Sequence, residues 1–209
     1  MSLPVTFLHV TDAHIAASTT ALDRDDHKTR VRGVVHDTRE DALERTFSRI
    51  VEKLKAISRQ LDGVLFTGDA QDKGRAGGHR ALLEMLLCYF QDLGINAAKI
   101  VAVPGNHDVP RSSEPSTAER YKEFLEVWRT SGCITPWLDG VDDATSLKHF
   151  LTASDNAWVV FPINSCNWSH APLELSEPLK SLWDQIPTRL KLGSPGVSTT
   201  CTVRRSRAL

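Results

Sequence analysis

The sequence predicts an α/β fold in which helices cover a sheet of strands. Short apolar runs rich in β-branched residues alternate along the chain with longer stretches of helical period, and polar residues directly follow three of the apolar runs. Hydrophobic residues make up 41% and charged residues 24% of the 209 residues, a composition typical of a globular domain. This composition excludes a disordered tail, a collagen-like fibre and a disulfide-dense scaffold.

The first predicted elements are a buried strand, a long connection and an amphipathic helix. Residues 5–11 (VTFLHVT) are mostly β-branched and aromatic, which favours a buried strand. Residues 16–36 are polar and irregular, an unusually long connection. Asp37 and Glu40 form a capping-box pattern, and the helical period that follows it is expected to stop at Gly63.

The remaining elements continue the alternation of strands and helices. Glycines precede or end several of them, as expected for turns and helix caps. In chain order they are a strand at 63–69, a helix at 79–93, a strand at 99–105, a helix at 118–130, a strand at 158–164 and a helix at 177–186.

Charge and cysteine usage narrow the function classes. Lys and Arg number 25 against 26 Asp and Glu, so nucleic acid is not indicated by charge, and the four cysteines form no CxxC pair that would suggest zinc or disulfides. The sequence shows neither a signal peptide nor an apolar run long enough to span a bilayer. We therefore expect a soluble, cytoplasmic protein without membrane contact, and its oligomeric state stays open.

Polar side chains fall where three of the predicted strands end. In parallel α/β sheets the carboxyl ends of the strands line the ligand crevice, so these side chains are expected to meet at one rim. The three segments are Thr11-Asp12-Ala13-His14, Gly68-Asp69-Ala70-Gln71-Asp72-Lys73-Gly74 and Gly105-Asn106-His107-Asp108.

The spacing of these residues predicts a metal site. Asp12 and His14 are two apart, so an extended backbone would point both side chains the same way. Asp69 offers a carboxylate that can bridge two ions, and Asn106 offers a neutral oxygen. Nitrogen and oxygen donors without thiolate favour Mn²⁺, Fe or Zn²⁺. Two ions roughly 3.5–4 Å apart would clamp a phosphoryl oxygen and activate a water molecule.

Residues around the motifs are expected to have structural roles. Gly68 and Gly105 would supply sharp turns at which a side chain would block a close backbone approach. His9, within the first strand, is expected to pack in the core. His79 and His149 are expected at the surface or in packing.

In this order and context the motifs resemble those of the calcineurin-like metallophosphoesterases, whose D-x-H, G-D-x-x-D and G-N-H-[DE] sequences each follow a strand of a β-sandwich flanked by helices. The motif-bearing resemblance covers about residues 5–110, and a looser one continues to about residue 186. It implies a metal-dependent phosphoesterase that hydrolyses a phosphomonoester or phosphodiester through a dinuclear centre of two divalent metal ions and a metal-bound hydroxide.

The resemblance also implies roles for single residues. Asp12 and His14 would bind the first ion, Asp69 would bridge both ions, and Asn106 would bind the second. His107 resembles the general acid that protonates the leaving oxygen. The remaining two implied roles belong to Asp72, which would orient His107, and Lys73, which would contact the phosphate.

The sequence departs from the family pattern in its last third. The family's further ligand histidine after the fourth strand and its G-H-x-H motif are missing, which leaves His170 as the one substitute ligand in that region. We therefore expect a sandwich incomplete at the C-terminus, with a metallophosphoesterase domain at 1–186 and a basic, irregular tail at 187–209. The tail is either non-native or a contact for an acidic partner.

Two alternative functions follow from these departures. The first is a truncated, catalytically impaired or regulatory member that retains a partial metal site. The second is nucleic-acid binding without catalysis, which rests only on the basic tail and the loop at 24–39. The substrate class (nucleotide, nucleic acid or phosphoprotein) stays open.

Overall fold

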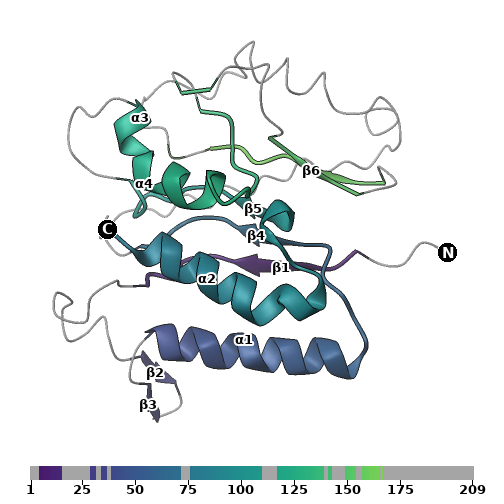
Figure 1. Ribbon diagram of the computed structural model, residues 1–209. Helices are drawn as coiled ribbons and strands as arrows, with labels where there is room; N and C mark the ends of the chain where they lie inside the picture. The colour runs from purple at the N-terminus through teal and green to yellow at the C-terminus, as the bar shows by residue number, and fades with distance from the viewer. Residues whose placement is uncertain are drawn as a thin grey trace.

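The computed structural model describes residues 5–15, 29–31, 34–36, 39–71, 76–109, 117–138, 141–142, 149–153, 157–164 and 166. Its centre is a three-stranded parallel sheet in the order β1-β4-β5 (Figure 1). The strands are β1 (Phe7–Val10), β4 (Gly63–Phe66) and β5 (Ile100–Ala102). Because the strands are parallel, their carboxyl ends lie at one edge of the sheet, which confirms this part of the predicted α/β architecture.

Two helices cover one face of this sheet. α1 (Arg39–Ala56) and α2 (Gly78–Phe90) lie side by side (Figure 1), and the ring centroid of Phe47 lies 5.9 Å from that of Tyr89 and 5.1 Å from that of Phe90. Alternate strand residues point to this face and form the core with the helices. Fully buried strand residues of this core are Val64, Phe66, Ile100 and Ala102.

A third helical segment packs beside α2. The helix predicted at 118–130 forms as α3 (Thr117–Arg120), α4 (Lys122–Phe124) and a π-helix η3 (Leu125–Arg129). In η3 the fully buried Trp128 stacks on Phe66, with ring centroids 5.0 Å apart and planes inclined by 17°. This stack fixes η3 against the sheet.

The opposite face of the sheet carries Phe7 and His9. The ring of Phe7 meets that of Trp158 edge-on at 5.1 Å. His9 is exposed, and its Nε2 lies 2.8 Å from Oγ1 of Thr67 in a hydrogen bond. The prediction that His9 packs in the core is wrong, because the period of two along β1 turns His9 away from the helices.

The strand predicted at 158–164 forms only in part. β7 (Val159–Val160) pairs antiparallel with β6 (Leu151–Thr152) in a separate two-stranded sheet. Across the described ranges this pair shares no ladder with the parallel sheet. Pro162, which lacks a backbone N–H, stands just after β7 and disfavours a longer ladder.

α1 ends at Ala56 rather than at Gly63 as predicted. Ser58 adopts a φ of 50°, and the N–H of Arg59 donates to the carbonyl of Leu54 at 2.9 Å. This is the hydrogen-bond pattern of a Schellman cap, in which Ser58 occupies the left-handed position usually held by glycine. The helix therefore stops before the glycine that seemed to end it.

The connection predicted to be irregular at 16–36 contains a hairpin. β2 (Thr29–Val31) and β3 (Val34–His36) pair antiparallel, consistent with the β-branched residues at this point. The helix predicted at 177–186 and the tail at 187–209 lie outside the described residues. No helix in the described part of the chain combines the length and apolar character needed to cross a membrane.

Candidate metal centre

Backbone hydrogen bonding between β1 and β4 continues beyond the ends of both strands. The N–H of Asp12 donates to the carbonyl of Gly68 at 3.1 Å, and the N–H of His14 donates to the carbonyl of Asp69 at 2.9 Å. These bonds extend the parallel pairing into the two loops. The sequence prediction that polar strand ends meet at one rim is therefore confirmed for β1 and β4.

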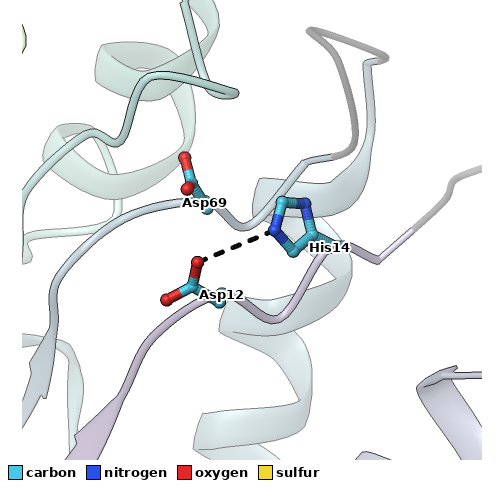
Figure 2. A group of neighbouring side chains, drawn as sticks. All are labelled: Asp12, His14 and Asp69. Atoms are coloured by element: carbon cyan, nitrogen blue, oxygen red, sulfur yellow. Dashed lines mark ion pairs between the residues drawn. The ribbon is translucent and has the colours of Figure 1, made fainter. Parts of the chain in front are cut away.

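The two loops bring together Asp12, His14 and Asp69 (Figure 2). Each offers one ligand atom, and these atoms all lie within 4.8 Å of one another. Nε2 of His14 lies 3.8 Å from Oδ1 of Asp12, whose side chain is 64% exposed, whereas that of His14 is 17% exposed. One imidazole nitrogen beside two carboxylates fits a divalent cation such as Mn²⁺, Fe²⁺ or Zn²⁺.

All three residues adopt left-handed backbone conformations. The φ angles are 53° at Asp12, 45° at His14 and 61° at Asp69, and Ser58 is the only other described non-glycine residue with positive φ. The prediction that extended backbone aligns Asp12 with His14 is thus wrong, although the side chains do meet. Their convergence comes from two strained turns, and such strain concentrates at functional sites.

Hydrogen bonds orient two of the ligand side chains. Nδ1 of His14 lies 3.1 Å from the carbonyl oxygen of Gln71. A carbonyl only accepts, so Nδ1 carries the proton of the neutral ring and Nε2 presents its lone pair to the site. The hydroxyl of Thr11 donates to Oδ2 of Asp12 at 2.7 Å.

The turn after β5 adds His107 to this group. The backbone N–H of His107 donates to Oδ1 of Asp69 at 2.8 Å, and its ring meets that of His14 edge-on at 4.8 Å. Asn106, the preceding residue, is exposed on the same turn. The structure therefore places His107 beside the candidate ligands.

Two glycines permit the close approach of the loops. A Cβ added to Gly105 would lie 2.1 Å from Oδ1 of Asp69. A Cβ added to Gly68, whose φ is +103°, would lie 2.5 Å from the Cα of Gly105. Both distances are shorter than any real contact, which confirms the predicted role of these glycines.

Asp108 ties the loops together, although the sequence reading gave it no role. Its Oδ2 accepts the backbone N–H of Asp69 at 2.7 Å and that of Gly105 at 2.8 Å, and its Oδ1 accepts that of Gln71 at 3.0 Å. Burial raises the pKa of this carboxyl, and the neighbouring His79 and the three N–H groups oppose that increase. The sequence signal that could have indicated this role is the position of Asp108 three residues after Gly105, the glycine of the turn.

His79 is fully buried behind Asp108, so the expectation of packing is confirmed and that of the surface is wrong. Its Nε2 lies 3.7 Å from Oδ1 of Asp108, and the indole N–H of Trp128 donates to its Nδ1 at 2.9 Å. Burial lowers the pKa of His79, an effect opposed by Asp108 and Glu123. No sequence pattern marked this residue, because its polar partners come from distant segments.

Three residues singled out in the sequence lie outside the described ranges. They are Asp72, Lys73 and His170.

Comparison with protein families gives a match. The family described as calcineurin-like phosphoesterase matches residues 5–183, which is most of the chain and includes the three motif segments. A search among curated proteins found no match.

Proposed function

The chain belongs to the calcineurin-like phosphoesterase family, and from this premise we propose that it is a metal-dependent hydrolase of a phosphomonoester or phosphodiester. The observation that carries the proposal is the convergence of Asp12, His14 and Asp69, whose ligand atoms lie within 4.8 Å of one another. The left-handed backbone at all three positions supports it, because a fold without use for this cluster would gain stability by relaxing it.

The donor set supports a divalent cation. One ion would take Asp12, His14 and Asp69, and a second would share Asp69 and use Asn106. When bound, such ions polarise a phosphoryl oxygen and lower the pKa of water. Figure 2 shows the three side chains on adjoining loops, with the carboxylates and the imidazole facing a common region.

The remaining residues would act on the substrate. The His107 ring lies 4.8 Å from that of His14, so a proton on His107 could reach an ester oxygen held at the same rim. The bond from its own N–H to Asp69 keeps this turn in register with the ligands. We assign proton donation to His107, its orientation to Asp72 and a phosphate contact to Lys73.

Hydrolysis of bis-p-nitrophenyl phosphate and p-nitrophenyl phosphate with and without Mn²⁺ tests the proposal. Asp69→Asn keeps the shape of the side chain and an oxygen for the N–H of His107 but removes the charge, so we expect turnover to fall by about a hundredfold or more. Asp62→Asn is the matched control, because Asp62 accepts the N–H of Thr6 at the other end of β4. Turnover that continues after all divalent metal ions are removed, or that persists in Asp69→Asn, would contradict the proposal.

A catalytically impaired or regulatory member is the second candidate. One observation favours it: the described residues supply a single cluster of three ligand side chains, enough for one ion. Calorimetric titration with Mn²⁺ separates the candidates. Two bound ions with turnover support the hydrolase, and one bound ion without turnover supports the impaired member.

A further inference from the structure

We propose that Trp128 and His79 are positioning residues of the metal centre, which they control through Asp108. The polar chain starts in η3, crosses the first turn of α2 and ends at the two loops that carry Asp69 and His107. The expected effect on metal affinity rests on the proposed function. The contacts that link Trp128, His79 and Asp108 do not depend on it.

The last link of this chain is the Asp108 carboxylate. It is fully buried and accepts backbone N–H groups from both loops, those of Asp69 and Gly105 through the same oxygen. The backbone carbonyl of Asp69 also accepts the N–H of His14. A shift of the Asp108 carboxylate would therefore move the backbone of one candidate ligand and, through it, of a second.

The middle link is His79, which faces this carboxylate from α2. The side chains of His79 and Asp108 are both 0% exposed, so no solvent screens their interaction. Nε2 of His79 has no hydrogen-bond partner among the described residues and lies 3.7 Å from Oδ1 of Asp108. A polar N–H buried in this way is held in place by the negative charge that it faces.

The first link, Trp128, decides which nitrogen of His79 carries the proton. An indole N–H only donates, so Nδ1 of His79 must accept and the neutral ring must be protonated on Nε2. With the opposite tautomer, the lone pair of Nε2 would face the buried carboxylate. The stack on Phe66 keeps Trp128 from turning away, so the tautomer is set by packing in η3.

This arrangement predicts an effect at a distance that packing alone would not produce. Trp128 contacts Phe66 and His79, and its replacement by phenylalanine keeps an aromatic ring on Phe66 while removing the N–H. Once that N–H is gone, His79 is free to adopt the other tautomer. The Asp108 carboxylate would then lose an attractive partner, and both loops would shift.

The test compares Trp128→Phe with Trp137→Phe in the full chain. Trp137 is also buried, but its indole nitrogen has no hydrogen-bond partner in the described part of the structure. For Trp128→Phe we expect Mn²⁺ binding, followed by electron paramagnetic resonance, to weaken by about tenfold. The amide resonances of Asp69, Gln71 and Gly105 should move in the same variant. For Trp137→Phe both readouts should match the wild type.

The tautomer of His79, read from ¹⁵N chemical shifts of its ring, gives an answer without any variant. We expect the Nε2–H form in the wild type, and a wild-type ring protonated on Nδ1 overturns the proposal even if Trp128→Phe fails to fold. A folded Trp128→Phe with unchanged amide shifts and Mn²⁺ affinity also overturns it. A wild type that binds no Mn²⁺ contradicts the proposed function instead, and the amide shifts then decide whether Trp128 positions the loops.

Discussion

The backbone N–H of His107 donates to Oδ1 of Asp69 at 2.8 Å. This bond joins the residue assigned to proton donation with the carboxylate assigned to bridge the metal ions. One oxygen of the Asp69 carboxylate therefore accepts a hydrogen bond from the turn that follows β5. The position of His107 and the orientation of the Asp69 carboxylate are thus linked, and a change in one should be felt at the other.

Gly105→Ala should break this link. Its methyl group would lie 2.1 Å from Oδ1 of Asp69, so the loops must separate. We expect the free energy of unfolding to fall by about 1–3 kcal/mol, a typical effect of overpacking. Mn²⁺ affinity should fall as well. Urea denaturation and Mn²⁺ titration measure the two effects.

Gly132→Ala is the matched control. Gly132 has a φ of +87°, but a Cβ there would meet nothing within 4 Å. It should lose about 1 kcal/mol from the left-handed backbone alone and bind Mn²⁺ as the wild type does. Equal metal affinities in the two variants would show that the closeness of the loops has no bearing on the site.

Asp12→Gly should stabilise the metal-free chain while weakening metal binding. Asp12 has a φ of 53° and an exposed side chain, so glycine relieves backbone strain with little loss of packing. We expect a gain of up to about 1 kcal/mol by urea denaturation without metal, since relief of strain exceeds the added freedom of the unfolded chain. Such a gain with loss of function is the usual sign of strain kept for a site.

Ser58→Gly separates strain from function. Ser58 has a φ of 50° at the end of α1, away from the metal-site loops. It should give a similar stabilisation with unchanged Mn²⁺ affinity. If Asp12→Gly instead destabilises the metal-free chain, the left-handed turn at that residue is not a source of strain.

The parallel sheet and its polar rim could be predicted because their signals are local. Buried strands such as 63–66 are continuous apolar runs, and a glycine and a carboxylate follow both β4 and β5 within a few residues. Parallel pairing then brings the strand ends together whatever the details of the loops. This topology brings the loops that carry Asp12, His14 and Asp69 together, whereas the left-handed turns in those loops decide how the three side chains converge.

The features that were missed depend on contacts between distant segments. Asp12 and His14 take left-handed conformations because their N–H groups bond to the loop after β4, which spacing cannot reveal. His79 becomes a buried polar link only because Asp108 and Trp128 reach it from far along the chain.

Arg129→Lys should destabilise the end of η3. The Arg129 guanidinium donates to both carboxylate oxygens of Asp142 and to the hydroxyl of Thr135, and the side chain of Asp142 is 2% exposed. Lysine cannot reproduce this fork, so we expect a loss of about 1–3 kcal/mol in thermal or urea unfolding. Arg45→Lys, at an exposed position of α1, is the control and should change stability by less than about 0.5 kcal/mol. Equal effects would mean that the fork adds nothing to stability.

His149 should make the fold less stable in mild acid. It is 1% exposed, and its Nδ1 donates to the carbonyl of Thr135 at 2.9 Å. Burial lowers its pKa below the usual 6.5 and Arg129 adds to this shift, whereas the bond to Thr135 and the charge of Asp142 oppose it. A lowered pKa in the folded state means that the stability from this group is complete above about pH 6.5 and is lost as the pH falls from there to the folded pKa.

His149→Asn isolates this contribution. Asparagine places an N–H where Nδ1 stands, so the bond to Thr135 can persist while the titration disappears. The free energy of unfolding, measured by urea denaturation between pH 8 and pH 5, should fall less steeply in the variant than in the wild type. His79, also buried with a lowered pKa, keeps a slope of the same sign in both proteins. Burial and the neighbouring Arg129 make a protonated His149 costly in the folded state. If the free energy of unfolding had the same pH dependence in the two proteins, the folded state would accommodate protonated His149 without this cost, and the prediction would be wrong.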